Sequence, residues 1–311
     1  MCRDGSPPQT ATVLAFELSG PDVDMVTTVP LFPLARNAFA AVGVRVHTLE
    51  LAFDRGYQLD LEALAQTLTP HTRLVSLASP QNPSGVALSR QTLHQVLALI
   101  ARHSPKAYLL VDETYREAAY GDDPVAASAV GLGERVISCA SLSKCHGAPG
   151  LRLGWLITRD TALRERLVTA KFNTIISCSV VDEALALAVF QRQDKILGDR
   201  RRHLAQGLAQ TAAWVARHGE QVAWVRPDAG ALCCLRLKPE AFGDQAVARF
   251  YAELAQRGIR AAPGTWFGDE ARVFRLGFGF LPLPDLAKAL NALGVALAAA
   301  KPSTAAMQLK E

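Results

Sequence analysis

The sequence has no long apolar run and no recognisable targeting segment. No stretch approaches the roughly 20 unbroken apolar residues that a membrane-spanning helix needs. The first residues, MCRDGSPPQT, lack the basic start and the apolar core of a secretory signal. We therefore expect a cytoplasmic protein with no membrane partner.

The cysteines have no spacing that suggests a disulfide framework or a metal site. None of the six forms a CxxC pair, and the adjacent Cys233 and Cys234 cannot form an ordinary structural bridge with each other. Buried free thiols in a reducing compartment are the expected state. No cluster of His, Cys and carboxylate residues has zinc-ligand spacing, so the sequence predicts no metal site.

A basic surface for nucleic acid is also lacking. The formal net charge is +4, and the densest basic run is DRRRH at 199–203. This run lies in a polar stretch with helical periodicity and has no interleaved aromatic residues. It is typical of a solvated helix face, so we expect no nucleic-acid partner.

The remaining composition is that of a globular protein larger than a single ordinary core. The chain has 311 residues, of which 50% are hydrophobic and 20% charged. Short apolar runs typical of strands alternate with helical patterns at 59–68 and 89–103, and Ser89 stands at the N-cap position of the second helix. The predicted strands lie at 44–51, 73–79, 107–113, 135–141 and 153–158. This alternation predicts an α/β fold with a large, doubly wound, mostly parallel sheet.

The pattern changes after about residue 160. Two long helical stretches span roughly 182–218, followed by a strand at 231–237, a helix at 246–258 and a strand at 273–279. There are no internal repeats, and the C-terminal tail is expected to fray. We predict a large α/β domain over residues 1–200 and a smaller α+β domain over residues 201–311.

Three polar motifs follow predicted strands, where ligands bind in parallel α/β sheets. SPQNPSG at 79–85 holds Asn82 between prolines, and VDETY at 111–115 places Asp112 at a strand end with Tyr115 three residues on. Taken alone, the first motif is equally consistent with an Asx turn. The second is equally consistent with a helix cap. A buried Asp112, however, needs a cationic partner or strong donors.

The third motif, SLSKCHGAPGLRLGW at 141–155, surrounds Lys144 with Ser141, Ser143, glycines and Arg152. A buried lysine near other cations has a lowered pKa and becomes a nucleophilic amine that can form a Schiff base. The serines and the forked arginine are suitable donors to a phosphate. A Schiff-base lysine, a carboxylate for a ring nitrogen and phosphate donors together match the binding requirements of pyridoxal phosphate.

These motifs resemble those of the class I/II aminotransferases, pyridoxal phosphate enzymes of fold type I. SPQNPSG is similar to the family's NPxNPTG, VDETY to DExY, and the Lys144 stretch to SxSKxxGxxGxRxGW. PLFP at 30–33 is similar to PxYP, and PGTWFG at 263–268 precedes FRLGF at 274–278. The order and spacing agree from about residue 11 to residue 298. The resemblance implies an enzyme that transfers amino groups between an α-amino acid and a 2-oxoacid, as a homodimer.

The resemblance also implies the catalytic roles. Lys144 would carry the cofactor as a Schiff base and then act as the general base. Asp112 would pair with the protonated ring nitrogen, and Asn82 and Tyr115 would hydrogen-bond the phenolic oxygen of the ring.

Further residues would bind the cofactor and the substrate. Phe32 would stack on the ring. Ser141, Ser143 and Arg152 would bind the phosphate, and Arg275 would bind the substrate α-carboxylate.

The sequence departs from the family pattern at its N-terminus and next to the lysine. Members usually have some eighty more residues before the PxYP motif, including a Gly-rich phosphate loop. The chain is therefore expected to lack the N-terminal segment, with Thr10 and Ala11 as a possible remnant of that loop. His146 replaces a frequent aromatic, and it could tune Lys144 or be structural. Cys145 could be redox-reactive or a buried packing thiol.

Three functions compete at this stage. The first is an aminotransferase acting on an α-amino acid. The second is another enzyme of the same cofactor and fold: a decarboxylase, a lyase or a cyclase. The third is a non-catalytic protein: a truncated pseudoenzyme with weak or no cofactor binding or, less favoured, a ligand-sensing domain.

Overall fold

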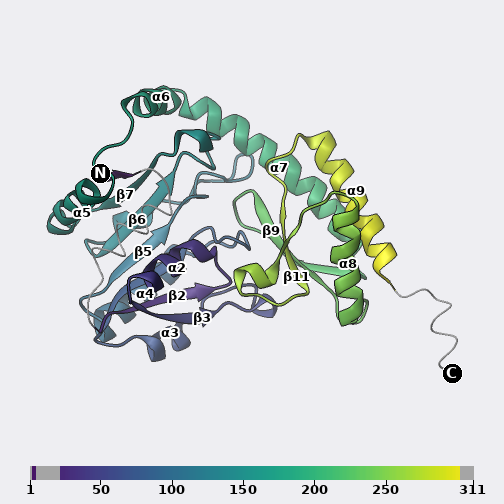
Figure 1. The fold of residues 1–311 in the computed structure, drawn as a ribbon, viewed down its shortest axis with the longest axis horizontal. Coiled ribbons are helices and arrows are strands. Elements are labelled where there is room, and N and C mark those ends of the chain that lie inside the picture. The colour runs from purple at the N-terminus through teal and green to yellow at the C-terminus, as the bar shows by residue number, and fades with distance from the viewer. Residues whose placement is uncertain (1, 5–21, 302–311) are drawn as a thin grey trace.

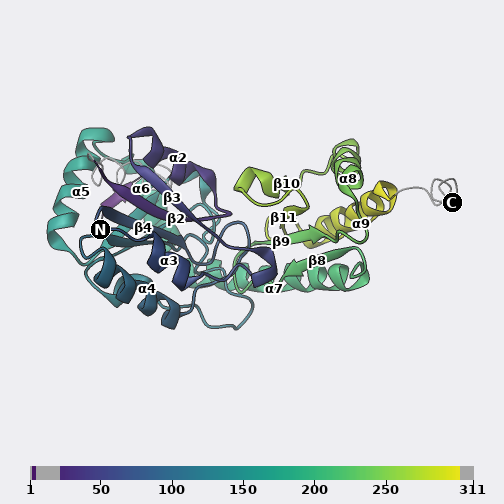
Figure 2. The same cartoon turned by 90° about the horizontal axis from the view of Figure 1, so that it is seen from below.

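The computed structural model describes residues 2–4 and 22–301. Their elements form two sheets with helices packed on them (Figures 1 and 2). Thr10 and Ala11, the possible remnant of the phosphate loop, lie outside the described residues, as does most of the C-terminal tail.

The larger sheet has seven strands in the order β1-β7-β6-β5-β4-β2-β3. Strands β2 to β6 are parallel to one another, whereas β7 is antiparallel to its neighbours β6 and β1. This is the predicted mostly parallel α/β sheet. The strands are β1 (Cys2–Asp4), β2 (Asp24–Val29), β3 (Arg45–Glu50), β4 (Thr72–Ala78), β5 (Tyr108–Asp112), β6 (Val136–Ser141) and β7 (Gly154–Thr158).

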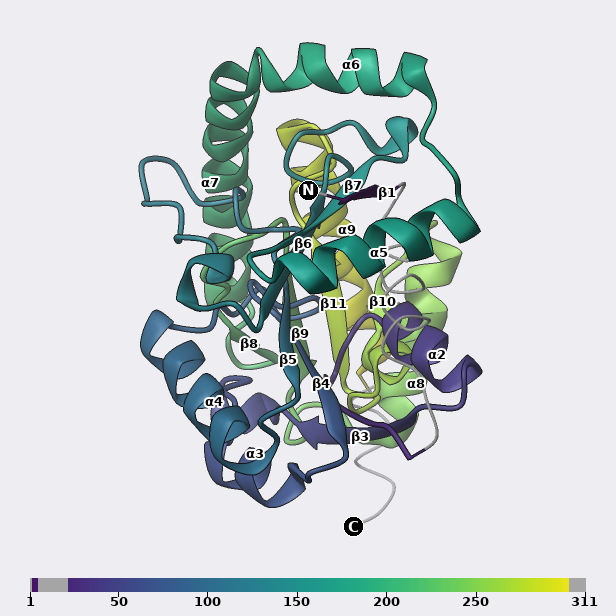
Figure 3. The ribbon, with the colours of Figure 1, turned by 90° about the vertical axis from the view of Figure 1, so that its left-hand side faces the viewer.

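Helices cover both faces of this sheet, as Figure 3 shows. On one face α3 (Leu61–Thr67) and α4 (Arg90–His103) pack through Leu64 and Val96 on residues such as Val75 and Leu109. On the other, α2 (Pro33–Ala41) and α5 (Thr161–Thr174) pack on the alternate residues of the same strands, Leu74 and Leu110 among them. Burial of both faces explains the nearly unbroken apolar strands of the sequence.

The helix starts follow ordinary capping chemistry. The Ser89 hydroxyl accepts a hydrogen bond from the Thr92 N–H at 2.9 Å, which confirms the predicted N-cap of α4. Asp60 and Asp160 cap α3 and α5 in the same way.

Strand β2 was not predicted, although it is buried and central to the site. It contains the buried polar residues Asp24, Thr27 and Thr28, so the sequence lacks the apolar run by which the other buried strands were predicted. The Thr27 hydroxyl donates to the Ser76 carbonyl at 2.9 Å, and Asp24 pairs with Arg45 at 2.7 Å. Tertiary partners therefore satisfy groups that the sequence pattern marks as polar.

The smaller sheet is antiparallel, in the order β10-β11-β9-β8. Its strands are β8 (Val222–Val225), β9 (Leu232–Leu237), β10 (Ala262–Pro263) and β11 (Val273–Gly277). Around it lie α7 (Gln193–Arg217), α8 (Asp244–Gln256) and α9 (Leu283–Ala300), while α6 (Val180–Phe190) precedes α7. Figure 1 shows α7 running without a break from one sheet to the other, and the predicted boundary at residue 200 falls inside it.

By length and composition alone, α9 could cross a membrane; it is the only such helix in the described part of the chain. In the fold it packs on α7 and α8, and Leu286, Leu290, Leu293 and Leu297 are buried in their shared core. A core helix passes the same composition test, so this feature is weak support for a membrane segment.

Candidate active site

Four polar loops meet at one edge of the large sheet. Strands β6, β5, β4 and β2 are consecutive parallel neighbours, so their carboxyl ends lie side by side. Phe32 follows β2, Asn82 follows β4, Asp112 ends β5 and Lys144 follows β6. The fold thus brings together residues separated by more than 100 positions, at the edge where such sheets bind ligands.

Asp112 presents a desolvated carboxylate to this edge. Burial raises its pKa, while hydrogen bonding to Thr114 and the charge of Lys144 act in the opposite direction. The Thr114 N–H donates to Oδ1 of Asp112 at 2.9 Å and holds the carboxylate in place. A desolvated carboxylate is stabilised by a cation, so it suits the protonated nitrogen of an aromatic ring.

Lys144 is accessible to solvent, yet its amine has cationic neighbours. Partial desolvation lowers the pKa of Lys144, and the charges of Arg275 and Arg152 lower it further; Asp112 opposes them. A lowered pKa increases the fraction of neutral, nucleophilic amine. The predicted cationic neighbours of this lysine are therefore present, whereas its side chain is exposed and not buried as the sequence predicted.

Arg275 comes from β11 of the small sheet and reaches the loop of the large one. Its Nη1 donates to Oδ1 of Asn82 at 2.8 Å, and its guanidinium lies 4.8 Å from the centre of the Phe267 ring. Burial lowers its pKa, and the described residues provide it with no carboxylate. Its remaining donors are available to a substrate carboxylate. The amide nitrogen of Asn82 is likewise left as a donor.

The predicted phosphate residues cluster after β6. The Ser143 N–H donates to the Ser141 hydroxyl at 3.3 Å, while the Ser143 hydroxyl oxygen is buried without a partner among the described residues. Arg152 has a positive φ of 48° and donates from Nη1 to the Pro149 carbonyl at 2.8 Å. A non-glycine residue in this region carries strain of the kind that clusters at functional sites.

Tyr115 is buried, and loss of hydration raises its pKa to about 12. The charge of Arg275 lowers that pKa, which places the two side chains near each other. At its other side, Gly230 has a positive φ of 101°, and a Cβ there would lie 3.8 Å from the Tyr115 side chain. The phenol is thus held as a neutral hydrogen-bond donor between the two domains.

Phe32 lies at the edge of the site and is 38% exposed, so its ring is accessible for stacking on a ligand. Trp266 makes an edge-to-face contact with it at 5.4 Å between ring centres and is itself 49% exposed. The motif PGTWFG contains Trp266, but the resemblance to the family implied no role for this residue. Only the contact between the two domains places it beside Phe32.

The two residues that follow Lys144 are structural. His146 is buried, with its ring 5.6 Å from that of Phe190 and 6.4 Å from that of Trp155, and burial lowers its pKa. The Cys145 thiol donates to the Thr114 carbonyl at 3.2 Å, and burial raises its pKa to about 12. A protonated, buried thiol is inert, so Cys145 is the packing residue of the two alternatives.

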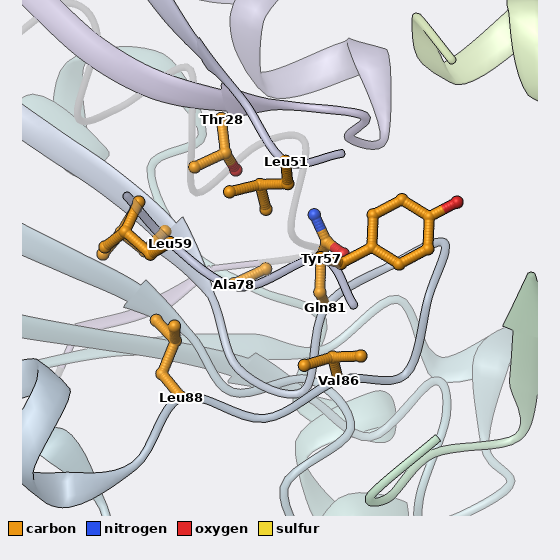
Figure 4. Close-up of a pocket in the computed structure, with 9 residues that line it drawn as sticks. Thr28, Leu51, Tyr57, Leu59, Ala78, Gln81, Val86 and Leu88 are labelled. Carbon is orange, nitrogen blue, oxygen red and sulfur yellow. The ribbon is translucent and has the colours of Figure 1, made fainter. Parts of the chain in front are cut away.

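The residues present fit pyridoxal phosphate. The unpartnered Ser143 hydroxyl and Arg152 match its phosphate, the desolvated Asp112 matches its ring nitrogen, and the Lys144 amine, whose pKa is lowered, matches its aldehyde. No group of three metal-ligating side chains occurs among residues 2–4 and 22–301. The cavity in Figure 4 is separate: at about 10 Å³ between Leu51, Tyr57 and Gln81, it has room for one water molecule.

The fold and site define the class of protein, a pyridoxal phosphate-dependent enzyme of fold type I. The sequence matches the family model of aminotransferase class I and II over residues 10–293, and the chain belongs to this family. The family confirms the predicted cofactor and the aminotransferase class.

Similar proteins include both transaminases and cyclases. Capreomycidine synthase of Streptomyces vinaceus is 27% identical over 284 residues, which are 91% of this chain and 71% of that protein. Arginine–pyruvate transaminase AruH of Pseudomonas aeruginosa is 26% identical over 269 residues, or 82% of this chain and 63% of that protein. The chain therefore spans about two thirds of the length of these relatives.

Solved structures agree with this fold. A PLP-dependent aminotransferase from Streptococcus suis superposes with a TM-score of 0.88 at 22% identity, over 97% of this chain and 78% of that one. The PLP-dependent cyclase OrfR superposes with a TM-score of 0.82 at 27% identity, over 95% and 77%.

Proposed function

We propose that this protein transfers an amino group between an α-amino acid and a 2-oxoacid. The observation that carries the proposal is the convergence of Lys144, Asp112 and Asn82 at the carboxyl ends of the neighbouring strands β6, β5 and β4, with Arg275 bonded to Asn82. When bound, pyridoxal phosphate supplies an aldehyde that condenses with amines and a ring that withdraws electrons from Cα.

Each residue of the site then has a defined task. The guanidinium of Arg275 binds the substrate α-carboxylate and fixes the orientation of the Cα–H bond. The Lys144 amine, whose pKa is lowered, would accept the Cα proton and return it to the carbon on the far side of the linking nitrogen, the one that carried the cofactor's aldehyde. With the cofactor bound, Asp112 would hold the ring nitrogen protonated through its negative charge. Asn82 and Tyr115 would donate hydrogen bonds to the phenolic oxygen of the ring.

Cofactor uptake by the purified protein tests this proposal. We expect saturable uptake of pyridoxal phosphate by visible absorbance, and borohydride should trap the adduct on the peptide that contains Lys144. Lys144→Ala serves as the control, with no trapped adduct. A folded protein that takes up no cofactor at any concentration would contradict the proposed function and favour the pseudoenzyme.

A cyclase is a second candidate, since capreomycidine synthase matches 91% of the chain and OrfR is a cyclase. The two reactions differ in what they leave behind. Transamination releases a 2-oxoacid and leaves the cofactor in its amine form until a second oxoacid is added. Cyclisation releases no oxoacid and returns the aldehyde form unaided. A screen of amino acids by absorbance, with mass spectrometry of the products, separates them.

We further propose that the protein is a homodimer. The segment from the end of α5 through α6 exposes an unusual number of large apolar side chains: Val168, Phe172, Ile176, Val180, Val181, Leu185 and Leu187. Exposed apolar residues in such number are typical of a protein interface. Light scattering should give twice the chain mass, and Val180→Asp with Val181→Asp should give the monomer. A wild-type monomer at all concentrations would refute the dimer.

A cytoplasmic location is proposed as well. Cys145, Cys233 and Cys234 are buried thiols, a state that oxidising compartments rarely preserve. Fractionation of the source cells, with detection of the native protein by antibody, tests this directly. Recovery in the secreted or periplasmic fraction would refute it.

A further inference from the structure

A second cavity lies behind the segment that carries Asp112 and Tyr115. Its volume is about 200 Å³, and residues from the end of β4, the start of α4, the end of β5 and the segment 126–132 line it. None of the residues assigned to the cofactor or the substrate lines it. It is therefore separate from the candidate active site, although Glu113 in its wall is adjacent to Asp112 in sequence.

The inner wall of this cavity is apolar. Leu93 and Val111 are buried, and Leu88 and Leu132 are partly buried. An apolar cavity of about 150 Å³ is large enough to hold a molecule the size of benzene. This cavity, of about 200 Å³, thus has room for a compact body of roughly six to ten non-hydrogen atoms.

The carboxylate in the wall is already satisfied. Oε1 of Glu113 accepts from the Ala129 N–H at 2.6 Å and from the Ser128 hydroxyl at 3.1 Å. Oε2 lies 3.4 Å from Nε of Arg116, which also donates to the Ala126 carbonyl and pairs with Glu117. Arg116 is thus shared by two carboxylates, and this part of the wall offers no unpaired cation to a ligand.

Arg90, unlike Glu113 and Arg116, carries a charge that no described residue pairs with. It lines the cavity as the first residue of α4 and is exposed, and within the described residues it makes no ion pair and no hydrogen bond through its side chain. The positive end of the dipole of this 14-residue helix adds to its charge. The Ser79 hydroxyl, which accepts from the Leu88 N–H at 2.9 Å, keeps its own proton to donate.

From these groups we propose that the cavity binds a small aliphatic monocarboxylate with a short branched chain. The chain lies against Leu93 and Val111, and the carboxylate pairs with Arg90. A dicarboxylate does not fit this scheme, because its second charge would lie against the apolar wall or Glu113. The site is additional to the proposed reaction, and its occupation does not require that reaction.

Calorimetric titration of the cofactor-loaded protein with 4-methylpentanoate tests the proposal. This probe has neither an amino nor an oxo group, so it cannot react at Lys144. An Arg275→Gln background removes the carboxylate-binding arginine of the active site. Binding should persist in that background, because Arg275 does not line the second cavity.

Surface variants then locate the binding. Arg90→Gln should weaken it by about two- to fivefold, which corresponds to the loss of one ion pair at an exposed site. Ala127→Trp, which fills the cavity mouth from an exposed position, should abolish it. Arg102→Gln, at the exposed far end of the same helix, is the matched control and should leave the affinity unchanged.

Three results would overturn the proposal. The first is absence of binding to the wild-type protein, and the second is binding that disappears in Arg275→Gln. The third is binding that is insensitive to both Arg90→Gln and Ala127→Trp. Acetate provides a further comparison: an affinity equal to that of 4-methylpentanoate would refute the apolar part of the site. Because the readout is binding alone, these outcomes are distinct from a failure of the transamination assay.

Discussion

At the scale of single residues, electrostatics explains why Lys144 and Asp112 form a functional pair. Desolvation acts on both, and it raises the pKa of the carboxyl while it lowers that of the amine. Each group is therefore less charged than it would be in water. A ligand that provides a cation to Asp112 and an aldehyde to Lys144 suits both groups at once.

Asp112→Asn tests the role of the carboxylate. The asparagine Oδ1 can still accept from the Thr114 N–H, so the loop should keep its conformation. Without the negative charge, we expect the half-reaction with an amino acid to slow on the order of 100-fold or more. Single-turnover absorbance measures this rate, and Asp123→Asn on the exposed turn is the control. A rate within a few-fold of wild type would contradict the assigned role.

The pH dependence of cofactor uptake tests the charges around Lys144. The lysine reacts as the neutral amine, so uptake is lost as the pH falls through the pKa of Lys144. Arg275 lowers that pKa, and Arg275→Gln should therefore raise it and move the acid-side midpoint of uptake to higher pH. The exposed Arg260→Gln should leave the midpoint in place. A shift to lower pH in Arg275→Gln would show that the sign of the interaction is wrong.

At the scale of elements, strand order decides where the chemistry lies. The four loops with Phe32, Asn82, Asp112 and Lys144 follow β2, β4, β5 and β6, and they meet because these strands are neighbours. Capping residues define where the intervening helices begin. The caps are local in sequence, whereas the strand order depends on pairing between distant segments. In β2, for example, Asp24 and Thr27 find their partners on β3 and β4.

The cap of α4 provides a test at this scale. Ser89→Ala removes the acceptor for the Thr92 N–H and should lower the stability by about 1 kcal/mol, seen as a reduced thermal midpoint. Ser89→Asp keeps an acceptor and should stay close to wild type. Equal losses in both variants would mean that the hydroxyl acts through another contact.

At the scale of the whole molecule, the two domains are joined through polar contacts around the 53–57 segment. The Tyr57 hydroxyl donates to Oδ2 of Asp269 at 2.7 Å, and Tyr57 is 1% exposed. Asp54 pairs with Arg236, whose guanidinium lies 4.3 Å from the centre of the Phe53 ring. Together with the bond from Arg275 to Asn82, these contacts set the distance between the two halves of the site.

Tyr57→Phe should therefore destabilise the protein by about 1 kcal/mol, the usual net value of one buried hydrogen bond. Asp54→Ala should cost less, because the Asp54 side chain is 75% exposed and solvent screens its pair with Arg236. Urea unfolding of both variants measures the difference. A larger loss for Asp54→Ala than for Tyr57→Phe would contradict this ranking.

The sequence by itself determined the fold class and, through its resemblance to a family, the cofactor; its motifs also named the candidate site residues. Its strands and motif loops are encoded by short-range patterns: apolar runs, prolines, glycines and a lysine between serines. It did not determine strand β2, the contact of Trp266 with Phe32, or whether Cys145 and His146 are reactive or structural. Only the tertiary structure decided these, because the partners come from other elements of the fold: Ser76 for Thr27, Thr114 for Cys145 and Phe32 for Trp266. The same holds for the bond from Arg275 to Asn82, which exists only once the two domains meet.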